Sequence, residues 1–121
     1  MIYTDQLAPY GRFGCDPPVE SLELLLKRMR DQETNIDLLF MPGDFIGHAI
    51  PLAAGKPFDP SKYTYLKQVH TTISDLLAKY LPNTLIIPTL GNNDFIYHYQ
   101  SPFAEQRDDF FTFLWQNWFE A

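Results

Sequence analysis

The chain has 121 residues, of which 45% are hydrophobic and 20% are charged. This balance excludes a disordered polar chain, and the length suits a single domain. Nine Lys and Arg against fifteen Asp and Glu give a net charge of −6, which argues against duplex nucleic acid as a partner. The longest apolar run, residues 85–90, is too short for a transmembrane segment.

The first eighteen residues are expected to form a loop. They lack a periodic apolar pattern and carry the turn formers Pro9, Gly11, Gly14, Pro17 and Pro18. From Val19 onward, apolar residues recur at helical spacing, and a preceding proline suits the first turn of a helix. A helix of about four turns is therefore predicted to begin at this point.

Two short apolar runs predict buried strands. Residues 37–41 are stopped by Pro42-Gly43, and residues 84–90 end at Gly91. Runs of this kind are typical of strands that are buried on both faces. A glycine follows each run, Gly43 after Pro42 and Gly91 directly after the second run, and the chain can turn sharply there.

Two further helices are predicted from periodicity. The first starts near Ser61, after a proline-rich loop at residues 49–60 that has a length often associated with function. Its apolar face comprises Leu66, Val69, Ile73, Leu76, Leu77 and Tyr80. The second covers residues 105–119 and is rich in aromatic side chains. The alternation of helices and strands predicts an α/β fold, a layered sheet of parallel strands with flanking helices.

Oxygen-bearing side chains follow both predicted strands. The first strand leads into Gly43-Asp44, and the second leads into Gly91-Asn92-Asn93-Asp94. The carboxyl ends of parallel strands meet at one edge of a sheet, where α/β proteins bind ligands. Carboxylate and amide oxygens, together with histidine, suit Mn, Zn or Fe in a hydrolytic centre. The same residues are also ordinary turn formers, so each motif alone leaves both interpretations open.

At these positions the sequence resembles the calcineurin-like metallophosphoesterases, whose motifs run D-x-H, G-D, G-N-H-[DE], H and G-H-x-H. Gly43-Asp44 and residues 91–94 resemble the second and third blocks. Residues 10–18, with His48 four positions after Asp44, resemble the acid sphingomyelinase-like phosphodiesterases. Residues 91–98 are similar to the vacuolar endopolyphosphatases, which also have Asn in place of His in the third block. The resemblance extends from about Tyr10 to Phe119.

The resemblance implies a four-layer fold with two divalent metal ions, Zn, Mn or Fe. Asp44 would bridge the two ions, and Asn92 would bind one of them through its amide oxygen. Asn93 occupies the catalytic position at which the family has a histidine that assists the leaving group, and an amide cannot act as a general acid near neutral pH. Asp94, also assigned to the catalytic group, would orient its neighbours or the loop.

Other residues receive roles from the same resemblance. His48 would approach the catalytic centre or be a plain loop residue, and His98 and Tyr97 would face the substrate, with Tyr99 and Phe103 lining the same cleft. Two residues and one segment receive no catalytic role. His70 would be structural or solvent-facing, Cys15 would be a buried thiol or half of a disulfide, and the terminal aromatic helix would form core or a docking face rather than a lipid-contacting surface.

Two motifs of the family, D-x-H and G-H-x-H, do not occur in the chain. Residues 1–121 are therefore expected to be a partial calcineurin-like phosphoesterase domain that carries only the second and third blocks. Such a chain would lack the remainder of the domain and would be inactive alone. The family branch is mostly secreted, lysosomal or vacuolar, and the same location is expected here by analogy.

The sequence thus favours a hydrolase, a metal-dependent phosphoesterase that cleaves a phosphodiester. The substrate would be a phosphate ester, such as a phospholipid head group, a nucleotide or polyphosphate. Two alternatives remain open: an endopolyphosphatase-like phosphoanhydride hydrolase, and a catalytically inactive fragment or binding module with the phosphoesterase fold.

Overall fold

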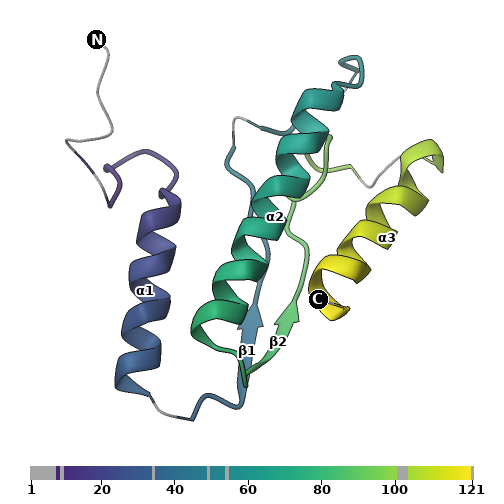
Figure 1. The fold of residues 1–121 in the computed structure, drawn as a ribbon. Coiled ribbons are helices and arrows are strands. Elements are labelled where there is room, and N and C mark those ends of the chain that lie inside the picture. Colours follow the sequence, from purple (N-terminus) through teal and green to yellow (C-terminus); the bar gives the residue numbers. More distant parts are fainter. Residues whose placement is uncertain are drawn as a thin grey trace.

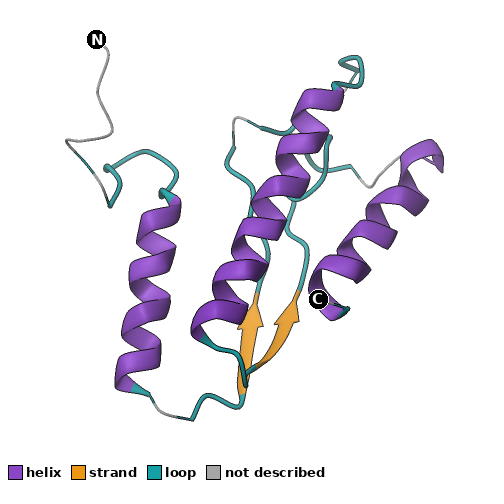
Figure 2. Cartoon of the chain, in the orientation of Figure 1, coloured by secondary structure: helices purple, strands orange, loops and turns teal. Residues whose placement is uncertain are grey.

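A computed structural model describes residues 8, 10–33, 35–48, 50–53, 55–100 and 104–120, with side chains of the last segment from residue 107. The elements follow the predicted order of helix, strand, helix, strand and helix (Figures 1 and 2). They are α1 (Val19–Gln32), β1 (Leu38–Met41), α2 (Pro60–Tyr80), β2 (Leu85–Pro88) and α3 (Ala104–Phe119). Before α1, the described residues form turns and irregular backbone, as predicted.

The sheet consists of β1 and β2 within the described part of the chain, and the two strands are parallel. The register pairs Leu38 with Leu85 and Met41 with Pro88. Helix α2 is the crossover that connects them, which is the connection that parallel neighbours require. The predicted α/β class and the parallel pairing are both confirmed.

Helix α2 begins where its sequence dictates. The carboxylate of Asp59 accepts hydrogen bonds from the backbone N–H groups of Ser61 and Lys62, and Pro60 occupies the first turn. These features satisfy donors that have no partner within the helix. The helix ends at Tyr80, after which the Leu81 N–H donates to the carbonyl of Leu77.

Helix α2 lies between α1 and α3, in front of the strands in Figure 1. Its apolar face contributes to two clusters. The first joins it to α1 and to the sheet through Leu26, Ile73 and Leu77, with Leu39 and Ile86 packed against them. The second joins it to α3 through residues that include Leu66, Phe110 and Leu114.

The expectation that both strands are buried on both faces is wrong. Phe40 is 64% exposed and Leu85 is 63% exposed. Helices α1 and α2 pack against Leu39 and Ile86 on one face, whereas no described element covers the opposite face. An apolar run predicts a strand, but whether both faces are buried depends on what packs against it.

Helix α3 divides its aromatic residues between core and surface. Phe110 and Leu114 are buried, as predicted for a core stripe. Phe111, Trp115 and Phe119 remain exposed and border an apolar groove of about 230 Å³ beside the end of β2. No helix within the described residues is long and apolar enough to cross a membrane.

Candidate active site

The loops that follow β1 and β2 lie in direct contact at the carboxyl end of the sheet. The chain turns there at Gly43, with a φ of 95°, and at Asp44, with a φ of 56°. A side chain at Gly43 would overlap the backbone of Leu90 and Gly91. The glycine is therefore needed both for its backbone angle and for the close approach of the two loops.

A single carboxylate joins the two loops. Asp94 is 0% exposed and accepts hydrogen bonds from four backbone N–H groups. The donors are Asp44 (2.7 Å), Phe45 (2.7 Å), Ile46 (3.2 Å) and Gly91 (2.8 Å). Burial raises the pKa of the Asp94 carboxyl above its ordinary value, while the four amides act in the opposite direction. Asp94 can thus fix the geometry of both loops, but it offers no surface to a substrate.

Asp44 and Asn92, the predicted metal ligands, lie on either side of this junction. The Asp44 carboxylate is exposed, and its Oδ1 accepts a hydrogen bond of 3.0 Å from the backbone N–H of Asn93. The amide nitrogen of Asn92 contacts His98 Nε2 at 2.9 Å and Asn93 Oδ1 at 3.3 Å. Within the described part of the chain, no donor reaches Asp44 Oδ2 or Asn92 Oδ1. These two oxygens are available to a cation.

The donor set fits part of a metal site. A carboxylate and an amide oxygen are suitable ligands for divalent ions. The described residues contain no group of three or more His, Cys, Asp or Glu side chains that could hold a metal. Asp44 and Asn92 are therefore two ligands that would need further donors to complete a site.

The site histidine predicted on the first loop, His48, contacts the block before α1. Its Nδ1 lies 2.9 Å from Asp16 Oδ1, and its backbone N–H donates to Asp16 Oδ2 at 3.0 Å. The side chain of His48 is 78% exposed. Hydrogen bonding by His48 lowers the pKa of the Asp16 carboxyl. No sequence pattern assigns a role to Asp16, although this residue belongs to the block at residues 10–18 that carries the resemblance.

The predicted substrate-facing residues differ in accessibility. The ring of His98 lies against that of Tyr99, with centroids 4.1 Å apart, and Tyr99 is 77% exposed. Tyr97 is only 4% exposed, and its hydroxyl donates to the carbonyl of Lys56. Tyr97 therefore presents no surface to a substrate in this structure, because it packs with Leu52 inside a small apolar cluster. Phe103 lies outside the described residues.

Three other predicted residues have clear positions. Asn93 is 2% exposed, and its side-chain oxygen faces the amide of Asn92. Cys15 is exposed and free, and its expected disulfide or burial in the full family stays a prediction. His70 is 0% exposed, which confirms a structural position.

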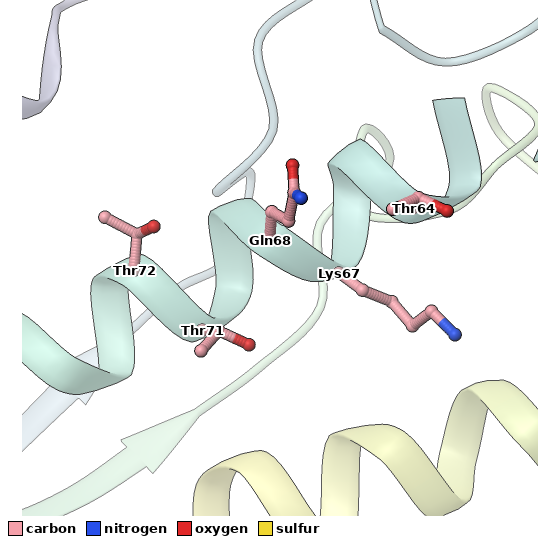
Figure 3. Close-up of a pocket in the computed structure, with 5 residues that line it drawn as sticks. All are labelled: Thr64, Lys67, Gln68, Thr71 and Thr72. Atoms are coloured by element: carbon pink, nitrogen blue, oxygen red, sulfur yellow. The ribbon is translucent and has the colours of Figure 1, made fainter. Parts of the chain in front are cut away.

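A separate hollow of about 450 Å³ lies on the surface of α2. Figure 3 shows its lining by Thr64, Lys67, Gln68, Thr71 and Thr72. None of the predicted site residues lines it, and all five lining residues come from one helix. The geometry therefore favours the strand-end junction over this hollow as the candidate active site.

Two curated proteins that are similar to this chain are named as phosphodiesterases. The chain is 31% identical over 109 residues to a sphingomyelinase phosphodiesterase D from Dictyostelium discoideum, which covers 90% of this chain and 22% of that protein. It is 24% identical over 115 residues to a sphingomyelin phosphodiesterase A from the same organism, covering 93% of this chain and 18% of that protein. The chain thus spans about a fifth of the length of these curated relatives. No family model and no solved structure matches it.

Proposed function

We propose that this chain supplies part of the active site of a metal-dependent phosphodiesterase of the sphingomyelin phosphodiesterase type. The observation that carries the proposal is the junction of the two strand-end loops, where Asp94 fixes the backbone beside Asp44 and Asn92. The names of the two relatives support the substrate class. The complete domain would have the four-layer calcineurin-like fold, to which β1, β2 and their helices contribute one portion.

Asp44 and Asn92 would bind the divalent ions, with Asp44 bridging two of them. Bound ions of this kind polarise a phosphoryl oxygen and lower the pKa of a bound water. His98 supports this arrangement, because its Nε2 engages the amide nitrogen of Asn92 and leaves the amide oxygen free. Asn93 supports it through its backbone N–H, which orients the Asp44 carboxylate.

A second candidate is hydrolysis of a phosphoanhydride such as polyphosphate. The contact between Asn92 and His98 favours it, since these residues follow the spacing of the endopolyphosphatases. We also propose a secreted, lysosomal or vacuolar location, on the analogy of the same family branch.

Activity assays of the complete gene product with Mn²⁺ or Zn²⁺ test this function. Sphingomyelin, bis-nitrophenyl phosphate and polyphosphate are the substrates that separate the two candidates. Asp44→Ala should reduce activity to background, because it removes the bridging carboxylate. Asp75→Ala is the matched control, since Asp75 is an exposed carboxylate on α2, and it should retain the native rate.

The expected outcomes separate an enzyme from a binding module. A complete gene product that hydrolyses none of the three substrates would refute the catalytic proposal and favour the inactive alternative. A retained rate in Asp44→Ala would refute the bridging role. The 121-residue chain alone should lose its metal on dialysis, and retention of two equivalents would contradict a site that needs further ligands.

A further inference from the structure

The imidazole of His70 is a buried polar group that the proposed active site does not use. The residue is 0% exposed, and neither of its ring nitrogens has a hydrogen-bond partner among the described residues. Nε1 of the adjacent Trp118 is unpartnered as well. Because a buried charge without a partner is strongly destabilising, this enclosure suits only a neutral ring. Helix α2 thus carries a basic group that the folded chain shields from solvent.

Three aromatic rings enclose the imidazole. Phe45, from the loop that follows β1, meets it edge-on with ring centroids 5.3 Å apart. Phe113 and Trp118, both from α3, lie at 6.2 Å and 6.1 Å. The amide of Asn117 on α3 donates to the backbone carbonyl of His70 at 3.4 Å, so it serves the backbone and not the ring. None of these contacts brings an acceptor oxygen to the ring.

The charged side chains of the adjoining segments are engaged elsewhere. On α2, the ammonium of Lys67 lies 3.5 Å from the carboxylate of Asp109 on α3. On the loop side, the Asp94 carboxylate accepts four backbone N–H groups. Within the described part of the chain, His70 forms no ion pair. Burial lowers the pKa of this imidazole to about 4, which keeps the enclosed ring neutral where a free imidazole takes up a proton.

Phe45 links this enclosure to the candidate metal ligand Asp44. Its backbone N–H donates to the Asp94 carboxylate at 2.7 Å, as does the N–H of Asp44, the residue before it. Its ring covers the imidazole of His70 and meets the ring of Trp118 at 5.3 Å. A displacement of Phe45 would therefore disturb the hydrogen bonds of the same carboxylate that holds the Asp44 backbone.

Phe45 is also the neighbour that can move at the smaller cost. Helix α3 is anchored by Phe110 and Leu114, which are buried in a cluster with Leu66. Detachment of α3 would expose all three apolar side chains. Phe45 is half-buried, so its displacement exposes less apolar surface. Water would therefore reach the imidazole past Phe45 before it did so past α3.

We propose that His70 is an acid-sensitive switch that opens the strand-end junction: its protonation displaces Phe45, and the Asp44 carboxylate then leaves the position in which it would bind a metal. The step is a proton transfer from solvent to one ring nitrogen. The opened form exposes an imidazole with the ordinary pKa of 6.5, whereas the closed form holds one with a pKa of about 4. As the pH falls through this range, the ratio of open to closed chains should rise by about tenfold per pH unit. The consequence for metal binding rests on the proposed function.

Amide hydrogen exchange of the 121-residue chain measures the opening without a metal. The protection of the Asp44 and Phe45 amides should fall by about tenfold per pH unit between pH 6.5 and 4, and it should stay below that of the α2 core amides. This slope should be largely absent in His70→Phe, with His70→Leu as a second variant of different shape. Asp75→Ala, which removes an exposed carboxyl group from α2, should keep the native slope.

Three exchange results would overturn the proposed switch. An unchanged slope in His70→Phe would show that another group drives the opening. A loss of protection confined to α3 would show that this helix gives way and that Phe45 stays in place. Loop amides that are as protected as those of the α2 core would mean that they exchange only on global unfolding.

Metal binding is tested in the complete gene product with Mn²⁺ alone. Between pH 6.5 and 4 the native protein should lose up to about a hundredfold more affinity than His70→Phe, whereas protonation of carboxylates affects both proteins equally. Equal losses would overturn the link between His70 and the metal. A native protein that binds no Mn²⁺ at pH 6.5 would overturn the proposed function, and the amide protection would still decide whether His70 opens the junction.

Discussion

Asp94 and His70 are both 0% exposed, yet the structure treats their polar atoms in opposite ways. The Asp94 carboxylate accepts four backbone hydrogen bonds. The two ring nitrogens of His70 have no hydrogen-bond partner among the described residues, and neither does Nε1 of the neighbouring Trp118. The Asp94 carboxylate determines the shape of the candidate site, whereas the His70 ring lies among aromatic rings.

Phe45 contacts both regions. Its backbone N–H donates to Asp94, and its ring meets that of His70 edge-on with centroids 5.3 Å apart. A buried polar group that is fully hydrogen-bonded stabilises one geometry, whereas one without partners is tolerated only while it stays uncharged. This comparison predicts that substitution of Asp94 lowers the free energy of unfolding at any pH. It also predicts that the native His70 lowers this free energy only in acid.

The largest expected effect is that of Asp94→Ala. The substitution leaves four backbone N–H groups without their acceptor in a buried junction. The free energy of unfolding should fall by about 4 kcal/mol, because each buried donor left unpaired costs about 1–3 kcal/mol before relaxation. Urea unfolding of the 121-residue chain measures the loss.

Asp94→Asn and Asp44→Ala are the matched comparisons. Asp94→Asn keeps one acceptor oxygen and should therefore lose less free energy of unfolding than Asp94→Ala does. Asp44→Ala removes an exposed carboxylate that accepts one backbone N–H, and should cost about 1 kcal/mol. A loss at Asp94→Ala no larger than that at Asp44→Ala would contradict the view that Asp94 holds the junction.

The junction was partly foreseeable from sequence. Apolar runs that stop at Gly43 and Gly91 predict strands whose ends meet, and the parallel pairing of β1 and β2 brings the two loops together as expected. The helix predicted to start near Ser61 is likewise observed, as α2. These features follow from local patterns and from one rule of chain topology.

Other features had no local signal. The contact between Asp16 and His48 spans 32 positions, and no periodicity relates the two residues. His70 stood at the flank of an apolar stripe, and its complete burial depends on Phe113 and Trp118, which α3 contributes. The exposure of Phe40 depends on what packs against the sheet. Each was decided by tertiary contacts that a single segment cannot reveal.

His70 should make the chain sensitive to acid. Burial lowers the pKa of this imidazole from 6.5 to about 4. Above pH 6.5 the ring is neutral in both folded and unfolded chains, so it adds no pH dependence. As the pH falls from 6.5 to about 4, the unfolded chain binds a proton that the folded chain does not. Stability should then fall by about 1.4 kcal/mol per pH unit, or about 3 kcal/mol in total.

The comparison with His70→Phe isolates this contribution. Carboxylates also titrate in acid, but they do so in both proteins, and the difference between the two stability curves cancels them. The variant should gain stability relative to the native chain as the pH falls from 6.5 to 4, with His70→Leu as a second variant of different shape. A constant difference across this range would mean that His70 is not buried as a neutral ring.

The smallest effect concerns the glycine that lets the two loops meet. Gly43 and Gly55 both have positive φ angles, 95° and 78°, so alanine strains the backbone at either position. A methyl group at Gly55 enters open space, whereas one at Gly43 overlaps the backbone of Gly91. The difference between the two variants therefore measures the crowding at the junction and not the backbone angle.

Gly43→Ala should be less stable than Gly55→Ala by about 2 kcal/mol in urea unfolding, the usual penalty for an added carbon in a packed region. It should also weaken any metal bound by Asp44 and Asn92 in the complete gene product, because relief of the overlap moves one loop away from the other. Equal losses in the two variants would mean that the two loops are not in close contact. Asp94 could then not accept hydrogen bonds from all four amides, because these amides belong to both loops.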